Sequence, residues 1–136
     1  MESIENKIVL TAGVYDLLHK GHINLFYKAR QLGSKLIVAV QYSEYVTKFK
    51  PGTKLYYSER ERLFLVSSIR YVDQVIQYTS VDNLVTQTNF DIFAIGPDQT
   101  NHAFKKAIEW CKANNKEVVV IPRTEGISSS FLRTLE

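Results

Sequence analysis

The sequence predicts one α/β domain, spanning residues 1–136, built on a mostly parallel sheet of five strands flanked by helices. The first observation is that short apolar runs alternate with amphipathic stretches from end to end, which is the pattern of βαβ units. The second is the length, because 136 residues fit one domain that encloses one core. The third is the composition, since 45% hydrophobic and 23% charged residues are ordinary values for a globular protein.

Five apolar runs are predicted to be the strands. The first two, KIVLTA at 7–12 and KLIVAVQ at 35–41, are continuous and rich in β-branched residues, as strands covered on both faces are. Three shorter runs follow at 73–77, 91–95 and 117–121. Strands that alternate with helices in this way predict a parallel, Rossmann-like sheet.

Two helices precede the middle of the chain, and a loop lies between them. Apolar residues recur at every third position of 22–32, and Gly33 follows as a stop signal. Ser58 and Glu61 form a capping-box pattern that opens a helix ending near residue 70. The stretch 42–57 between them is polar and rich in Lys and Tyr, so it is predicted to be a long loop, a kind of segment that is usually functional.

Three more helices are predicted in the second half. The clearest begins at Asn101 and has apolar residues at positions i, i+3, i+4 and i+7, namely Phe104, Ala107, Ile108 and Cys111. A weak helix is predicted at 81–89 and a short closing helix at 128–135. In such sheets a ligand sits outside the carboxyl ends of the strands, which directs attention to 13–22, 42–54, 96–101 and 122–130.

Composition excludes several classes of partner. The 17 basic and 14 acidic side chains give a formal charge of +3, too small an excess to predict binding of nucleic acid. No apolar run approaches the ~20 residues that span a bilayer, and the amino terminus does not read as a signal peptide, so no membrane contact is expected. The single cysteine, Cys111, has no partner for an internal disulfide and indicates a reducing compartment, so the expected location is the cytoplasm.

The loop GVYDLLHKGH at 13–22 places two histidines just after the first strand, at the start of a helix. Backbone N–H groups at a helix N-terminus favour an anion, and the donors of His19 and His22 suit a phosphate. Gly21 lets the backbone approach the ligand closely. The alternatives are two structural histidines or a zinc site, but zinc needs at least three protein ligands and Cys111 lies far along the chain.

A second phosphate site is predicted near the end of the chain. Arg123 offers a planar, permanently charged group that matches phosphate oxygens. Ser128, Ser129 and Ser130 begin the predicted closing helix, where hydroxyls and unpaired N–H groups converge on one anion. One serine at a helix N-cap is common, but three in a row exceed what capping requires.

These two segments resemble the signatures of the cytidylyltransferase-like nucleotidyltransferases. The motif HKGH at 19–22 matches their hallmark HxGH, and RTEGISS at 123–129 matches their second signature. The resemblance covers nearly the whole chain, includes IRYVDQV at 69–75, and is strongest to the branch that uses glycerol 3-phosphate. It implies an enzyme that transfers CMP from CTP to a small phosphorylated acceptor, with glycerol 3-phosphate the leading candidate, and that releases pyrophosphate.

The resemblance also implies roles for individual residues. The implied catalytic residues are His19, His22, Lys48 and Arg123. The implied nucleotide-binding residues are Gly13, Val14, Tyr15, His19, Gly21, His22, Lys50, Gly96, Asp98, Arg123, Thr124, Gly126, Ile127, Ser128 and Ser129. The implied acceptor-binding residues are Asp16, Lys48, Arg62 and Arg70. Mg²⁺ is the expected cofactor, bridging the leaving phosphates with no metal site formed by the protein alone, and a homodimer is the expected assembly.

Other interpretations stay open at this point. Lys48 and Lys50 are alternatively a solvated face, Asp16 orients its loop, and Arg62 forms a surface ion pair with Glu59. Leu84 stands where the glycerol 3-phosphate branch has a lysine, and GPDQ at 96–99 lacks that branch's aromatic residue. The acceptor is therefore alternatively another small phosphate or phosphonate. A sugar-phosphate adenylyltransferase and a non-catalytic nucleotide-binding sensor are the remaining alternatives.

Overall fold

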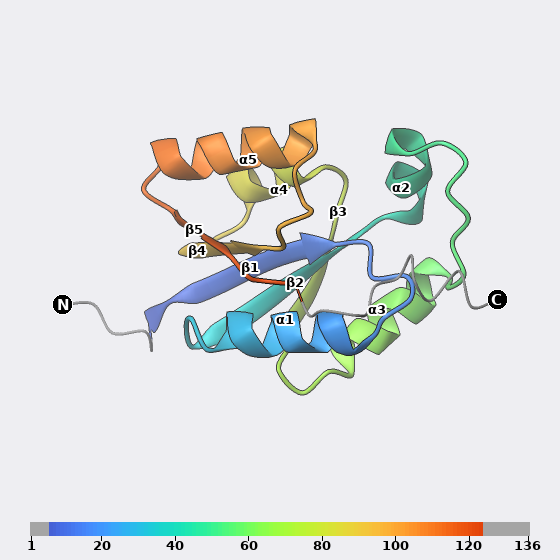
Figure 1. Ribbon diagram of the computed structural model, residues 1–136, viewed down its shortest axis with the longest axis horizontal. Helices are drawn as coiled ribbons and strands as arrows, with labels where there is room; N and C mark the ends of the chain where they lie inside the picture. Colours follow the sequence, from blue (N-terminus) through green and yellow to red (C-terminus); the bar gives the residue numbers. More distant parts are fainter. Residues whose placement is uncertain (1–5, 124–136) are drawn as a thin grey trace.

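The computed structural model describes residues 6–123, which contain a five-stranded parallel sheet (Figure 1). Its strands are β1 (Ile8–Gly13), β2 (Lys35–Gln41), β3 (Gln74–Tyr78), β4 (Ile92–Ile95) and β5 (Glu117–Val120). They lie in the order β3-β2-β1-β4-β5, and all four pairings are parallel. The predicted fold class is confirmed, and each strand lies within one residue of its predicted bounds.

Helices cover both faces of the sheet. They are α1 (Lys20–Arg30), α2 (Ser43–Phe49), α3 (Glu59–Ser67), α4 (Val81–Gln87) and α5 (His102–Ala113). Helices α1 and α3 pack on one face, and α4 and α5 pack on the other (Figure 1). The middle residues of β1 and β2 are almost completely buried because apolar side chains meet them on both sides. No helix within residues 6–123 is long and apolar enough to cross a bilayer.

The prediction of a loop throughout 42–57 is wrong, because residues 43–49 form α2. This helix has only seven residues, buries only Val46, and lacks a side-chain cap at Tyr42. It therefore carries neither the apolar period nor the end signals that reveal a helix in a sequence. Helix α1 also begins two residues earlier than predicted, at Lys20, because His19 is its N-cap. The predicted helix at 128–135 lies outside the described residues.

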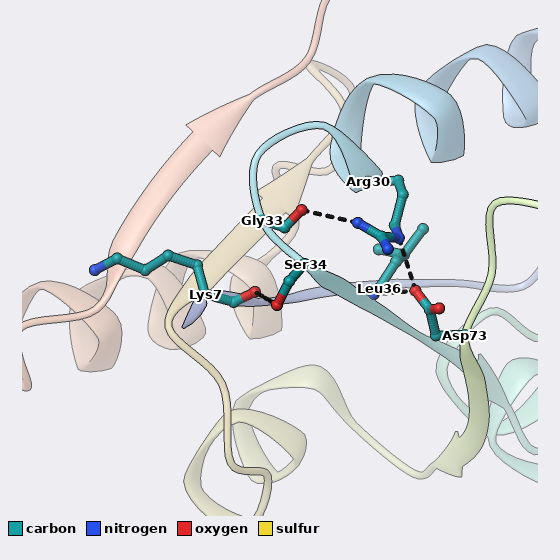
Figure 2. Close-up of polar contacts among 6 residues, drawn as sticks. All are labelled: Lys7, Arg30, Gly33, Ser34, Leu36 and Asp73. Atoms are coloured by element: carbon teal, nitrogen blue, oxygen red, sulfur yellow. Dashed lines mark hydrogen bonds and ion pairs between the residues drawn. The ribbon is translucent and has the colours of Figure 1, made fainter. Parts of the chain in front are cut away.

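Hydrogen bonds and an ion pair connect elements at the amino-terminal edge of the sheet (Figure 2). This edge is opposite to the carboxyl edge, where the ligand is predicted to bind. The carboxylate of Asp73 accepts a hydrogen bond from Leu36 N at 2.8 Å and pairs with Arg30 Nε at 2.9 Å. Arg30 also donates to the carbonyl of Gly33 at 2.8 Å. A Cβ on Gly33 would lie 2.4 Å from the carbonyl oxygen of Lys7, so the glycine is required by the close approach of another backbone. These contacts join the ends of α1, β2 and β3.

Candidate active site

A cleft of about 560 Å³ lies at the carboxyl edge of the sheet, and all four segments selected from the sequence contribute to it. The loop after β1 and the first turn of α1 form one wall. The loop after β4 and the residues after β5 form a second, and α2 with the loop that follows it forms the third. This is the place where parallel α/β sheets bind their ligands.

Gly13 and Tyr15 shape the first wall together. Tyr15 is not glycine but has a φ of 57°, in the left-handed region that non-glycine residues rarely adopt. Its ring lies back beside Gly13, where it is buried and makes edge contacts with Phe26 and His22. A Cβ on Gly13 would lie 2.8 Å from the Tyr15 ring. The glycine is therefore required by the buried tyrosine, which in turn supports one side of His22.

The two histidines form a reciprocal cap at the start of α1. Nδ1 of His19 accepts a hydrogen bond from Gly21 N at 2.9 Å, and Nδ1 of His22 accepts one from His19 N at 3.2 Å. Their rings lie close together, with centroids 4.0 Å apart. The first turn contains no acidic residue, so nothing in it neutralises the positive end of the helix dipole.

This cap determines which nitrogen of each ring carries hydrogen. A neutral imidazole has one donor and one acceptor nitrogen, and here both Nδ1 atoms accept. In both neutral rings the hydrogen is therefore on Nε2. His19 and His22 both line the cleft, so each offers one N–H donor to a ligand beside the helix N-terminus.

Both rings are neutral at pH 7. Burial lowers the pKa of His19 below its ordinary value. Burial, with repulsion from His19 as a second cause, lowers the pKa of His22 to about 4. The pair therefore acts as hydrogen-bond donors without carrying charge before the ligand binds.

We expect these pKa values to make stability fall as the pH is lowered from 7 to 5. The unfolded chain takes up protons on its histidines near the ordinary pKa of about 6.5, whereas folded His22 does so only near 4, so acid favours unfolding. The urea midpoint of the wild type should therefore decrease over this range, and that of His22→Gln should decrease less. An equal decrease in both proteins would contradict the lowered pKa.

The second wall contains Asp98 and Arg123, which form an ion pair with each other. Both side chains are more than half exposed, so this pair exchanges readily for contacts with a ligand. Gln99 holds the same wall to the centre of the sheet. Its amide donates to the carbonyl of Ala12 at 2.7 Å and accepts from Gly96 N at 3.0 Å. Gln99 stands where the resemblance predicts an aromatic residue. Its two hydrogen bonds connect the ends of β1 and β4.

The third wall contains only one of the two lysines that were predicted to bind phosphate together. Lys50 lines the cleft, as does Val46 one helical turn before it. Lys48 does not line it, and its amino group lies over the rings of Tyr45 and Phe49, 5.3 and 6.0 Å from their centroids. Lys48 lies in the last turn of α2, whereas Lys50 is its C-cap residue with a non-helical backbone, so the two side chains leave the chain in different directions. The structure thus brings Lys50, but not Lys48, to the histidine pair.

Two residues assigned to the acceptor, Arg62 and Asp16, form hydrogen bonds with other parts of the protein. Arg62 is fully buried and donates to the carbonyls of Val14 and Gln41 and to the hydroxyl of Ser43. The alternative of a surface ion pair is therefore wrong for Arg62. The buried carboxylate of Asp16 accepts hydrogen bonds from the backbone of Tyr56 and Tyr57, as expected of a residue that orients its loop, although it also lines the cleft.

A family model described as cytidylyltransferase-like matches residues 10–135. The chain belongs to the cytidylyltransferase-like family. It is 36% identical over 130 residues to the glycerol-3-phosphate cytidylyltransferase of Bacillus subtilis, covering 93% of this chain and 95% of that protein. It is 40% identical over 127 residues to the FAD synthase of Thermococcus kodakarensis, covering 90% and 85%. The lipopolysaccharide core biosynthesis protein from Thermoplasma volcanium has a similar structure, with a TM-score of 0.74, 27% identity and coverage of 88% and 98%.

The chain is therefore a nucleotidyltransferase, and its cleft contains all of the predicted nucleotide-binding residues that the structure describes. Those residues are Gly13, Val14, Tyr15, His19, Gly21, His22, Lys50, Gly96, Asp98 and Arg123. Thr124, Gly126, Ile127, Ser128 and Ser129 lie outside the described residues. Arg70 follows α3 and lies near the amino-terminal edge with Asp73, so the structure does not bring it to the cleft. Leu84 is a buried core residue of α4.

Sequence reasoning did not select several residues that line the cleft of this nucleotidyltransferase. They are mainly apolar: Leu25, Val46, Thr53, Leu55, Pro97, Gln99, Ile121 and Pro122. Apolar side chains in a sequence are indistinguishable from core residues, so they gave no signal. Gln99 could have been selected from the sequence, because it is a polar residue in the loop after the fourth strand, directly after Asp98. Within residues 6–123, no three His, Cys, Asp or Glu side chains are grouped as a metal site would require.

Proposed function

We propose that this nucleotidyltransferase transfers CMP from CTP to a small phosphorylated acceptor, with glycerol 3-phosphate as the leading candidate, and releases pyrophosphate. The observation that carries the proposal is the pair of Nε2 donors on His19 and His22, which line one cleft with the cation of Lys50. The similarity to glycerol-3-phosphate cytidylyltransferases over nearly the whole chain supports both the nucleotide and the acceptor.

In the proposed reaction a phosphate oxygen of the acceptor attacks the α-phosphorus of CTP in line with the leaving group. The new P–O bond forms as the bond to the β-phosphate oxygen breaks, and its electron pair leaves with pyrophosphate. No covalent enzyme intermediate is required. His19 and His22 donate hydrogen bonds to the phosphates as negative charge shifts, and Lys50 and Arg123 neutralise that charge.

Mg²⁺ enters as the metal complex of the nucleotide. Magnesium commonly binds through substrate phosphates and water with few protein ligands, which fits a cleft whose described residues form no carboxylate cluster. When bound, it neutralises charge on the leaving phosphates. The residues of this chain then hold and orient the phosphates around it.

One observation favours a second candidate, an adenylyltransferase whose acceptor has a larger apolar body. The wall beside Lys50 presents Val46 and Leu55 to the cleft, whereas Lys48 and Lys54 lie over the aromatic rings of neighbouring residues. The 40% identity to an FAD synthase agrees with such an acceptor. A nucleotide-binding sensor is disfavoured, because two histidine donors in one cleft exceed what binding of a nucleotide requires.

The test combines binding with turnover. CTP with Mg²⁺ should raise the melting temperature more than ATP, GTP or UTP at equal concentration, because tighter binding stabilises the folded state more.

Pyrophosphate release should then be compared for glycerol 3-phosphate, other small phosphates and phosphonates, and flavin mononucleotide. A larger shift with ATP, together with turnover of the flavin, would replace the first candidate by the second. If another small acceptor exceeds glycerol 3-phosphate more than about tenfold in kcat/KM, which corresponds to about 1.4 kcal/mol, only the acceptor assignment fails.

We also propose that two copies of the chain associate. Phe64 lies on the outer side of α3 and is 68% exposed, and its burial against a second copy would favour association. Light scattering should give about twice the chain mass of 15.6 kDa. A mass equal to one chain at micromolar concentration would contradict the dimer.

A further inference from the structure

Residues 43–57, comprising α2 and the loop after it, form a strap along one side of the cleft. Val46, Lys50, Thr53 and Leu55 of this strap line the cleft. Its middle is exposed, and Gly52 has a φ of 86° in open space, since a Cβ added there would meet no atom within 4 Å. The position of Lys50 therefore depends on how the two ends of the strap are held.

The first end is held by α3. Arg62 Nη2 donates to the hydroxyl of Ser43 at 2.7 Å, and Glu59 accepts a hydrogen bond from Ser43 N at 2.8 Å. Arg62 Nη1 donates at 2.9 Å to both Val14 and Gln41, at the carboxyl ends of β1 and β2. One buried guanidinium thus connects the strap to the two strands that form the base of the site.

The second end is held by the loop that leads to the histidines. Asp16 accepts hydrogen bonds from the backbone N–H groups of Tyr56 and Tyr57, at 2.9 to 3.1 Å. Asp16 is three residues before His19, so the same short loop joins the end of the strap to the histidine pair. Both ends are therefore fixed relative to the base of the cleft, which fixes where Lys50 lies.

We infer that Ser43 and Arg62 are positioning residues that hold the strap so that Lys50 faces the histidine pair. The inference rests on the proposed function in assigning Lys50 to substrate phosphate. Arg62 itself has no route to a ligand, because it is fully buried and its two terminal nitrogens are bonded to the protein. It acts through the strap, and the Ser43 hydroxyl is the contact that transmits its position to α2.

The first experiment measures the strap without substrate. Hydrogen exchange of the amides of residues 44–50 should be faster in Ser43→Ala than in the wild type, and Ser43→Thr, which keeps the hydroxyl, should restore the wild-type rate. Ser67→Ala is the matched control, because Ser67 is an exposed serine at the end of α3 whose hydroxyl donates to Phe64 of its own helix. Equal exchange in Ser43→Ala and Ser67→Ala would overturn the inference.

The second experiment is a double-mutant cycle on turnover. Loss of a hydrogen bond to a charged group predicts a decrease of about tenfold in the kcat/KM of Ser43→Ala. In a Lys50→Ala background the same change should cost less than about twofold, since two residues that act through one contact are not additive. Equal losses in both backgrounds would overturn the inference. Absence of pyrophosphate release from the wild type would overturn the proposed function instead, and the exchange rates would still decide whether Ser43 holds the strap.

Discussion

His22→Ala is expected to lower kcat by about 100-fold to 1,000-fold, the usual cost of removing one preorganised donor to a transition state. His22 Nε2 is that donor, because Nδ1 is occupied by the backbone of His19. The comparison is His102→Ala, since His102 is an exposed histidine in the first turn of α5 that lies outside the cleft. Its kcat should stay within about twofold of the wild type, which is the scale of an ordinary surface substitution.

A second substitution separates catalysis from capping. His22→Glu keeps a side-chain acceptor for His19 N, because glutamate is the usual partner at this position of a capping box. It provides no donor at pH 7. We expect its melting temperature to be close to that of the wild type and its kcat to be at least as low as that of His22→Ala. If His22→Glu instead recovers turnover, the role of His22 is to cap α1 and the donor assignment is wrong.

Lys50→Ala should lower kcat/KM by about 10-fold to 100-fold, the value of a hydrogen bond to a charged phosphate. Lys48→Ala should change kcat/KM by less than about threefold, because its amino group lies over aromatic rings away from the cleft. The pair is well matched, since both lysines are exposed and two residues apart. Steady-state kinetics with CTP and each acceptor provide the measurement. A larger effect from Lys48 would mean that α2 turns its other side to the substrate.

The fold was predictable from the sequence because its strands are continuous apolar runs. Such short runs are typical of strands that are covered by helices on both faces of a parallel sheet. The position of His19 and His22 in the cleft was predictable because both follow the first strand within one short loop. Lys48 and Lys50 show the limit of this reasoning. The directions of these two side chains depend on α2, which has only seven residues and buries only one side chain. The sequence therefore has no apolar period that would predict this helix.

Arg62 shows a different limit. Arginine is almost always exposed unless it is paired, and its position on α3 predicts a surface residue. Its burial is stabilised by three acceptors, the carbonyls of Val14 and Gln41 and the hydroxyl of Ser43, which converge from distant parts of the chain. The carboxylates of Glu59 and Asp16 also favour its charge. Such convergence is a property of the tertiary structure. Arg70 does not line the cleft, because its position depends on where α3 ends relative to the sheet.

The strap is anchored at its two ends, by Ser43 and by the backbone contacts of Asp16. Its middle can therefore change in length among related enzymes without loss of these anchors. Residues 51–55 lie between the anchors, so a change in their number leaves the contacts of Ser43 and Asp16 in place. Doubling the length of a flexible loop costs only about 0.6 kcal/mol in closure entropy. Insertions and deletions at this place are therefore inexpensive in stability, yet each one changes the wall of the cleft that contains Thr53 and Leu55. If the proposed function holds, the fit to the acceptor can change here while His19 and His22 stay in place.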